Sequence, residues 1–418
     1  MSTQLLPESP PADATGGPHD ADAQAADSNG ADGAACEVSV VIPCLNESDT
    51  IGTCVTKAVR ALREADVDGE VIVADNGSTD GSRDIARSAG ARVVPVARKG
   101  YGCALMGGIA AARGRYVVMG DADDSYDFLE VPKFVNKLRE GHDIVQGCRL
   151  PGGGGEIRPG AMPFLHRWWG NPMFSALTRW WFRAPVNDVY CGLRGFRREY
   201  YQWLDLRCTG MEFATEMIIK ASLFGGRFAE VPVTLHPDGR VAHAPHLRTY
   251  RDGWRTLRFF LMYSPKWLFL LPGKLLVLLG AIAYALGLPS TRVGAVTFEA
   301  HTVLFGSLAI LCGYQAILFA IFTKEFAIGE GLLPGDHRLD RLYKRVNLER
   351  GLLLGAGAVV AGAALLSRVV WQWYSSGLGH LEYGQTMKWV IPGATLTVLG
   401  VQTVMSSFFV NILRMRRL

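Results

Sequence analysis

The hydrophobic pattern of the chain changes at residue 37 and again near residue 267. Between these points, short β-branched runs that end in polar residues alternate with stretches of helical spacing. This alternation predicts a mostly parallel sheet with helices on both faces. The expected strands are 38–42, 70–74, 92–96, 115–119 and 142–146, and the expected helices are about 50–66, 80–89, 101–113 and 130–140.

Long apolar stretches dominate the rest of the chain. Each is close to the roughly 20 residues that a helix needs to cross a bilayer, so we expect transmembrane helices rather than core helices of a soluble protein. The second and fourth stretches contain no Asp, Glu, Lys or Arg, and the others contain only Lys274 and Arg368. The four expected spans are about 267–288, 302–322, 351–374 and 389–413.

Basic residues predict the orientation of these helices. The segment 323–350 holds six Lys or Arg residues, whereas 289–301 and 375–388 hold one each. By the positive-inside rule, the N-terminal part of the chain, the segment 323–350 and the C-terminus lie in the cytoplasm. The sequence therefore predicts a multi-pass protein of the cell (inner) membrane with both termini on the cytoplasmic side.

Composition adds to this picture. Of the 418 residues, 49% are hydrophobic and 20% are charged, against about 25% charged in soluble domains. Residues 1–35 contain six acidic and no basic residues, so we expect a disordered acidic tail without a secretory signal. Because the net charge is +4 and this tail contributes −6, the rest carries +10. We attribute that excess to anionic lipids and a phosphate-bearing substrate, and expect no nucleic-acid partner.

The eight cysteines are scattered without a Cys-x-x-Cys pair, which is typical of reduced thiols rather than disulfides or zinc ligands. Two other stretches, 166–183 and 250–271, interleave tryptophan with arginine. Helices of this composition lie in the headgroup region of a membrane, although they also occur inside soluble domains. The expected domains are the tail at 1–35, an α/β domain at 36–240, an interfacial amphipathic helix at 241–266 and a transmembrane domain at 267–418.

Polar residues follow three of the expected strands. Asn46 and Glu47 follow the first strand, Asp75 follows the second, and Asp121 and Asp123 follow the fourth. In a parallel sheet, ligands bind beyond the carboxyl ends of the strands. Two carboxylates in an Asp-x-Asp motif there can bind one divalent cation, whose other ligands are phosphate oxygens and water. A solvated acidic turn has the same motif, but the neighbouring polar strand ends favour a binding site.

Five segments together resemble the family-2 glycosyltransferases with a GT-A fold, and especially the dolichyl- or polyprenyl-phosphate sugar synthases. They are Val-Ile-Pro-Cys-Leu-Asn-Glu at 41–47, Asp-Asn-Gly-Ser-Thr-Asp at 75–80, Asp-Ala-Asp at 121–123, Asp-Val-Tyr-Cys-Gly-Leu-Arg-Gly-Phe at 188–196 and Met-Glu-Phe-Ala-Thr-Glu at 211–216. The resemblance covers about 37–240. It implies an α/β GT-A domain with a Rossmann-like, mostly parallel sheet, followed by an all-α membrane domain of four transmembrane helices.

The resemblance also implies roles for individual residues. The nucleotide sugar is expected to contact Pro43, Leu45, Asn46, Glu47, Asp75, Asp121, Ala122 and Asp123. The metal, Mg²⁺ or Mn²⁺, is expected at Asp121, Asp123 and Ser125, where similar synthases often have Gln at the last position. The acceptor phosphate is expected at Arg149, Arg240 and Arg248. The catalytic candidates are Asp123, Arg149, Arg194 and Glu216.

Two of these candidates have structural alternatives. Arg194 can instead pair with Asp188, and Glu216 can instead cap a neighbouring turn. The chain also departs from the family after Arg240, because His246-Leu-Arg248 stands where the family has a Ser-Lys pair. We therefore expect a different acceptor-side loop.

The reaction implied is inverting transfer of a hexose from a nucleotide-diphosphate sugar to polyprenyl phosphate at the cytoplasmic membrane face, as in cell envelope glycan biosynthesis. A cation would neutralise the departing diphosphate, and an ionised lipid phosphate needs no strong general base. The sequence leaves open the sugar, the nucleotide, the prenyl length and whether a homo-oligomer forms.

Four other functions remain as alternatives. A transferase acting on a lipid alcohol would need a base. A processive polysaccharide synthase would carry Gln three residues before Arg-Trp, where this chain has Phe164 and Ala176. A dinucleotide-binding oxidoreductase would carry Gly-x-Gly-x-x-Gly. Here Gly100 and Gly102 fit the first two positions, but the next glycine, Gly107, comes too late for the third. A membrane scaffold would bind no nucleotide sugar.

Overall fold

The computed structural model describes residues 36–240, 249–345 and 347–415. The chain divides into two compact units, Met1–Thr256 and Leu257–Leu418. The expected acidic tail at 1–35 lies outside the described residues. The expected interfacial segment at 241–266 contains α8 (Thr249–Met262), and its first part, 241–248, also lies outside them.

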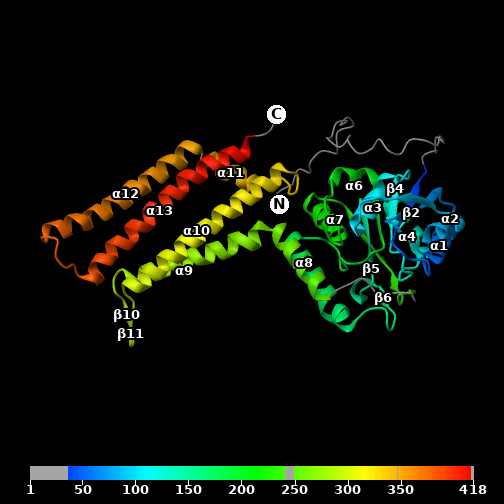
Figure 1. Cartoon of the computed structure of the whole chain (residues 1–418), viewed down its shortest axis with the longest axis horizontal. Coiled ribbons are helices and arrows are strands. Elements are labelled where there is room, and N and C mark those ends of the chain that lie inside the picture. Colours follow the sequence, from blue (N-terminus) through cyan, green and yellow to red (C-terminus); the bar gives the residue numbers. More distant parts are fainter. Residues whose placement is uncertain (1–35, 241–248, 346, 416–418) are drawn as a thin grey trace. The chain divides into compact units, whose positions relative to one another are not determined.

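The first unit, which contains the strands labelled β2, β4 and β5 in Figure 1, is built on a seven-stranded sheet. The strand order is β3-β2-β1-β4-β7-β5-β8. The strand pairs are parallel except those that β7 makes with β4 and β5. The strands are β1 (Val38–Cys44), β2 (Gly69–Asp75), β3 (Arg92–Pro95), β4 (Tyr116–Met119), β5 (Ile144–Cys148), β7 (Arg194–Arg197) and β8 (Phe228–Pro232). The mostly parallel sheet and the five expected strands are confirmed, with bounds shifted by up to two residues.

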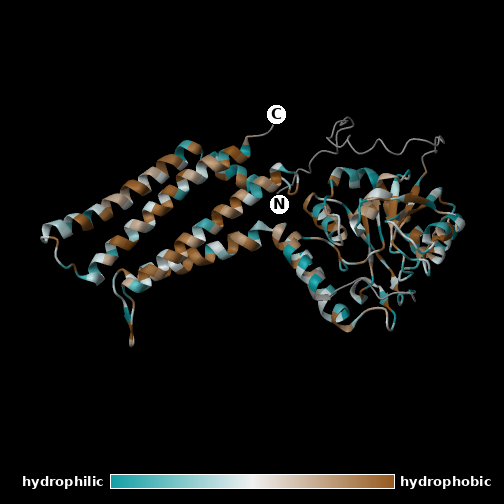
Figure 2. Ribbon diagram, in the orientation of Figure 1, coloured by the Kyte–Doolittle hydropathy of each residue, from teal (hydrophilic) through white to brown (hydrophobic). Residues whose placement is uncertain are grey.

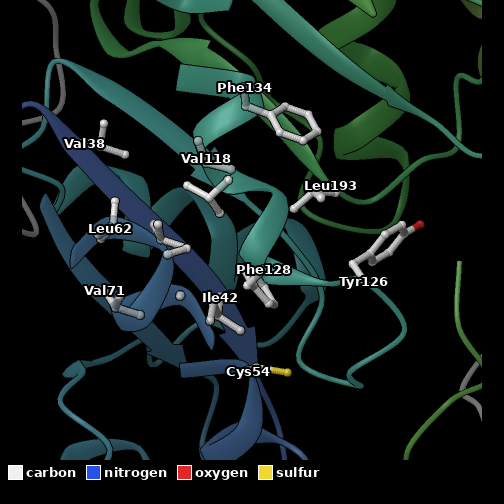
Figure 3. Packing of buried hydrophobic residues seen from close by; sticks show 14 of the residues in the cluster. Val38, Ile42, Cys54, Leu62, Val71, Val118, Tyr126, Phe128, Phe134 and Leu193 are labelled. Atoms are coloured by element: carbon white, nitrogen blue, oxygen red, sulfur yellow. The ribbon is translucent and has the colours of Figure 1, made fainter. Parts of the chain in front are cut away.

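Helices cover both faces of this sheet because β1 is apolar on both. Val40 and Ile42 point into one hydrophobic cluster, which includes α1 and α4 residues (Figure 3), whereas Val41 points into another, which includes α3 and α7 residues. The helices of this unit that lie wholly within it are α1 (Ile51–Glu64), α2 (Ser82–Ser88), α3 (Tyr101–Ala110), α4 (Val131–Arg139), α5 (Asn171–Phe182), α6 (Arg198–Leu204) and α7 (Glu212–Leu223).

Short elements complete the first unit. The two-stranded sheet of β6 (Glu156–Ile157) and β9 (Thr234–Leu235) is parallel. Single turns of tighter or wider helix form η1 (Phe128–Glu130), η2 (Pro151–Gly153) and η3 (His166–Gly170). In the described part of the chain all eight cysteines are free thiols, as expected.

The second unit contains four helices that are long and apolar enough to cross a membrane, and Figure 2 shows their mostly hydrophobic colouring. They cover Lys266–Gly287, Ala300–Gly329, Leu348–Ser375 and Tyr383–Arg414. The first is as long as its expected span and shifted by one residue, and the other three are longer than expected. The first is made of η4 (Lys266–Leu270) and α9 (Leu271–Gly287), and the others are α10, α12 and α13. A hairpin of β10 (Arg292–Val293) and β11 (Val296–Thr297) joins α9 to α10, and α11 (His337–Arg345) joins α10 to α12.

Glycines allow these helices to pack in two close pairs. A Cβ atom on Gly280 of α9 would lie 2.6 Å from the Gly306 carbonyl oxygen of α10. Similarly, a Cβ atom on Gly355 of α12 would lie 2.8 Å from the Gly400 carbonyl oxygen of α13. Helix association in membranes depends on such small residues, because the bilayer provides no hydrophobic driving force between helices.

Polar side chains join one pair to the other, between α10 and α13. The Thr395 hydroxyl of α13 lies 2.6 Å from the Ser307 hydroxyl of α10. About two helical turns further along α13, the Gln402 side-chain amide donates a 3.0 Å hydrogen bond to Gln315 of α10. Hydrogen bonds between buried and half-buried polar side chains thus hold the two helical pairs together.

Candidate active site

The turn after β2 is organised around the Asp75 carboxylate. Asp75 Oδ1 accepts from the Ser78 backbone N–H at 3.0 Å, and Oδ2 accepts from the Gly77 backbone N–H at 3.1 Å and from Arg83 Nε at 2.6 Å. Burial raises the pKa of Asp75, but these hydrogen bonds and the Arg83 charge outweigh it, so the net shift is downward. Gly77 has a φ of 93°, which only glycine adopts without strain. Asp75 is therefore a fixed carboxylate.

The loop after β1 is bonded to this turn. Asn46 adopts a left-handed φ of 58°, and its side-chain oxygen accepts from the Thr79 backbone N–H at 2.9 Å. The Glu47 backbone N–H donates to the Ser82 hydroxyl at 2.9 Å. Pro43 lies within β1 and Leu45 is 39% exposed. The expected nucleotide-binding residues of the first two strands thus form one connected edge.

The Asp-x-Asp motif directly follows β4. Asp121 Oδ1 accepts from the Tyr101 hydroxyl at 2.8 Å, and Asp123 Oδ1 accepts from the Ser125 hydroxyl at 2.6 Å. Ala122 between them is buried, and its carbonyl oxygen accepts from the Cys54 thiol at 3.5 Å. Asp121, Asp123 and Ser125 thus lie on one turn after β4, and their role as metal ligands stays a prediction.

The electrostatics of this motif fit a cation. Burial and the neighbouring charge of Asp123 raise the pKa of Asp121 to about 6, against the opposing effects of Tyr101, Arg240 and Arg149. A divalent cation would relieve this repulsion, and carboxylate and hydroxyl oxygens are the ligands that Mg²⁺ and Mn²⁺ prefer. Within 36–240, 249–345 and 347–415, no group of three or more His, Cys, Asp or Glu side chains is arranged to hold a metal. The substrate would therefore have to supply the remaining ligands.

Arg240 joins this motif to the β1 edge. Its Nε donates to Glu47 Oε2 at 2.7 Å, and its Nη2 lies 3.5 Å from Asp123 Oδ2. Its Nη1 also lies 3.1 Å from Asp238 Oδ2. Only 13% of the Arg240 side chain is exposed. One guanidinium thus contacts three carboxylates, which keeps an expected phosphate ligand at the centre of the acidic edge.

Arg149 lies in a buried ion pair. Its Nε and Nη2 donate to the two oxygens of Asp188 at 2.7 and 2.9 Å, and its Nη1 donates to the Tyr126 hydroxyl at 3.2 Å. Asp188 is fully buried and also accepts from the Tyr190 backbone N–H at 3.2 Å. Asp188 therefore pairs with Arg149, whereas the sequence suggested Arg194 as its structural partner.

Arg194 and Glu216 lie inside the domain. Arg194, on β7, is fully buried and donates to the backbone carbonyl oxygens of Ala214 and Val189 at 2.5 and 3.3 Å. Burial lowers the pKa of Arg194 to about 10. Glu216 Oε2 accepts from the backbone N–H groups of Arg207 and Cys208 at 3.0 and 2.7 Å. Glu216 thus makes the turn-capping contacts that we gave as its structural alternative. Arg248 lies outside the described residues.

Tyr101 is a site residue that sequence reasoning missed. It begins α3, and the first turn of that helix is anchored where the Cys103 backbone N–H donates to the Thr209 carbonyl oxygen at 3.2 Å. A Cβ atom on Gly102 would lie 2.6 Å from the Cys208 carbonyl oxygen. The segment that Glu216 caps therefore packs against the start of α3. The only signal in the sequence was the close pair of glycines around Tyr101.

Comparisons with known proteins identify the family of the chain. Residues 39–204 match the family described as glycosyl transferase family 2, and residues 321–414 match its C-terminal transmembrane region. The low-salt glycan biosynthesis hexosyltransferase Agl6 of Haloferax volcanii is 36% identical over 377 residues, which are 90% of this chain and 88% of that protein. The chain belongs to glycosyltransferase family 2.

Other relatives match about half of this family-2 glycosyltransferase. A dolichyl-phosphate hexose transferase of Haloferax volcanii is 34% identical over 47% of this chain and 82% of that protein. A crystal structure of glucosyl-3-phosphoglycerate synthase from Mycobacterium tuberculosis, with Mn²⁺, UDP and glucosyl-3-phosphoglycerate, is 26% identical, with a TM-score of 0.42 over 54% of this chain and 78% of that chain. The resemblance inferred from the motifs is confirmed, as is the order of an α/β transferase domain and a helical membrane region. This chain is a membrane glycosyltransferase.

Proposed function

We propose that this glycosyltransferase moves a hexose from a nucleotide-diphosphate sugar to a polyprenyl phosphate, with inversion, at the cytoplasmic face of the cell membrane. The observation that carries the proposal is the acidic pair Asp121 and Asp123, held between the Tyr101 hydroxyl and the Arg240 guanidinium in a chain that also has four membrane-span helices. Two relatives, a hexosyltransferase and a dolichyl-phosphate hexose transferase, support the hexose and the lipid phosphate.

The donor would lie along the edge formed by the loops after β1, β2 and β4. Asp75 and Glu47 would face the nucleoside, because their carboxylates are fixed by neighbouring N–H groups. Asp121, Asp123 and the Ser125 hydroxyl would hold Mg²⁺ or Mn²⁺. When bound, that ion would neutralise charge on the departing diphosphate.

The acceptor would bind at the same edge. Its phosphate is ionised at neutral pH, so the residues around it need to supply positive charge rather than a general base. Arg240 is the described cation closest to the acidic pair, and Arg248 would follow it along the chain. Arg149 would act on the phosphate mainly through its charge, because its guanidinium is already bound to Asp188 and Tyr126. Its proposed direct contact with phosphate stays a prediction.

The first unit also presents an apolar surface that suits contact with lipid. The aromatic side chains of Phe164, Trp168, Trp169 and Trp180 are 61–72% exposed along η3, α5 and the residues before them. Arg167 lies over the Trp168 ring at 5.5 Å from its centroid. Exposed tryptophan beside arginine is typical of the membrane headgroup region. This surface supports a lipid acceptor over a soluble one.

The test is transfer by the purified full-length chain from radiolabelled nucleotide sugars, extracted into organic solvent. Polyprenyl phosphate is compared with polyprenol and diacylglycerol, with Mg²⁺ or Mn²⁺, and the anomeric configuration of the product is read by NMR. We expect transfer only to the lipid phosphate, with inversion. Transfer to a lipid alcohol, retention, or long glycan products would reject the corresponding part of the proposal.

Two neighbouring carboxylates give a matched pair of variants. Asp123→Asn removes a carboxylate that faces Arg240 and is expected to abolish transfer. Asp124→Asn removes one that instead pairs with Lys57 at 2.8 Å, and asparagine tolerates the left-handed φ of 56° at this position. We expect this control to retain transfer. Equal activity of both variants would refute the metal-binding role of Asp123.

A further inference from the structure

A short helix of the second unit carries cations that the proposed reaction does not use. α11 (His337–Arg345) follows α10 and precedes α12, so the chain on either side of it leads into a helix long enough to cross a bilayer. Leu339 on this helix is buried, whereas Arg338, Arg341 and Lys344 are exposed. α11 is therefore an amphipathic helix that the chain itself places next to a membrane surface.

These exposed cations form no salt bridge with the described residues, although the Arg338 charge helps to lower the pKa of Asp336. In the described part of the chain, no ion pair within 4.0 Å involves Arg338, Arg341 or Lys344. Of the nearby acids, Asp336 pairs with Lys324 and Glu325 pairs with Arg414, whereas Asp340, on α11 itself, lies 4.0 Å from His337 Nδ1. The positive charge of α11 is therefore available to an external anion.

α11 is also held in place. The Arg414 guanidinium, in the last turn of α13, lies 4.1 Å from the centroid of the Tyr343 ring and 3.5 Å from Glu325 Oε1 of α10. One cation thus ties α11 to the ends of two membrane-span helices. Beside this contact is a hollow of about 270 Å³ lined by Asp340, Tyr343, Lys344 and Arg414. The cations are consequently fixed at one end of the helical bundle, next to a space that a headgroup can enter.

We propose that α11 binds the headgroups of anionic phospholipids through Arg338, Arg341 and Lys344. Two observations favour this partner: the chain connects α11 directly to membrane-span helices, and its exposed charge is positive and unpaired. Basic residues next to a bilayer are attracted to anionic lipids, by about fivefold in binding per cation, so three give on the order of a hundredfold. The proposal needs only the membrane location of this unit, and does not depend on the sugar acceptor.

The experiment uses the purified full-length chain in a mild detergent. Dioleoyl phosphatidylglycerol or dioleoyl phosphatidylcholine is added at matched concentrations, and native mass spectrometry counts the lipids retained. The wild-type chain should prefer phosphatidylglycerol. The variant Arg338→Gln/Arg341→Gln/Lys344→Gln should lose roughly a hundredfold in this preference, and added salt should weaken the preference of the wild type by screening.

A matched control removes the same charge elsewhere. Arg60→Gln/Arg63→Gln/Arg87→Gln changes three exposed cations on α1 and α2 of the first unit, and should leave the lipid preference unchanged. Equal loss in both variants, or no preference in the wild-type chain, would overturn the proposal. If the acidic residues 1–35 occupy α11 instead, the preference would appear only after their six carboxylates are neutralised. That outcome also overturns it. Retention of lipid requires no sugar transfer, so the two proposals fail separately.

Discussion

The ion pair between Arg149 and Asp188 allows a quantitative test of how the first unit is built. Asp188 is fully buried, and its carboxylate accepts hydrogen bonds from Arg149 Nε, Arg149 Nη2, the Arg149 backbone N–H and the Tyr190 backbone N–H. The substitution Asp188→Asn preserves the size of the side chain but removes its charge. It would leave the Arg149 guanidinium buried without a counter-ion. It would also place an amide N–H, itself a donor, among the hydrogen-bond donors that now face the carboxylate.

Removing one partner of such a pair destabilises a domain by about 3–5 kcal/mol, a large share of the about 5–15 kcal/mol that stabilises a typical domain. At about 1.4 kcal/mol per factor of ten, this raises the population of opened molecules roughly a hundredfold to several-thousandfold. The double variant Asp188→Asn/Arg149→Met removes both charges. It should recover most of the loss, because no charge is then left buried alone.

The assay is the rate at which buried thiols react with a maleimide, followed by peptide mass spectrometry. Cys148 lies next to Arg149 and Cys54 lies on α1, and both are fully buried, so both react only in opened molecules. We expect the rate at both sites to rise a hundredfold or more in Asp188→Asn, because the unit opens as a whole. An increase of less than tenfold, or a double variant as reactive as the single one, would refute the reasoning.

Two further predictions concern the acidic edge and the β2 turn. Tyr101→Phe should leave the fold intact but weaken metal-dependent binding of nucleotide sugar about 10- to 100-fold, because a hydrogen bond to a charged group contributes about 1.5–3 kcal/mol; unchanged affinity by calorimetry would exclude this role. The pKa of Asp80 is lowered to about 2, because hydrogen bonds from Ser82 and Ser48 outweigh the opposing effect of burial. A lowered folded-state pKa means that its stabilising contribution is complete above the ordinary value of 3.8 and is lost as the pH falls toward 2. Asp80→Asn should therefore weaken the dependence of the free energy of unfolding on pH between these values, as measured from fluorescence-detected unfolding. An unaltered pH dependence would contradict the lowered pKa.

The sequence predicted those parts of the fold whose burial is visible in a single segment. The run at 38–44 is buried almost throughout, so its residues are apolar on both faces and identify a central strand. β7 was missed because Arg194 and Arg197 lie at its ends, and their burial depends on β4 and β5, which come from elsewhere in the chain. Four residues of mixed polarity carry no periodic signal of their own.

The same distinction applies to the site. The strand-end carboxylates were found because each follows its own strand. The bond from Arg240 to Glu47 joins residues 193 positions apart, and the pair of Arg149 with Asp188 spans 39. Such pairings depend on the order in which strands meet in the sheet, which hydrophobic periodicity does not report. For Tyr101, the hydroxyl has a role only because α3 begins beside the Asp-x-Asp motif.

The two glycine-packed pairs of membrane helices also set the order in which the C-terminal region can assemble. α9 and α10 contact each other through their own glycines, so this hairpin can close in the bilayer as soon as both helices have left the ribosome. Ser307 and Gln315 on α10 find their partners only on α13, the last helix to be synthesised. Until α13 is present these two side chains lack the hydrogen-bond partners that they have in the folded bundle.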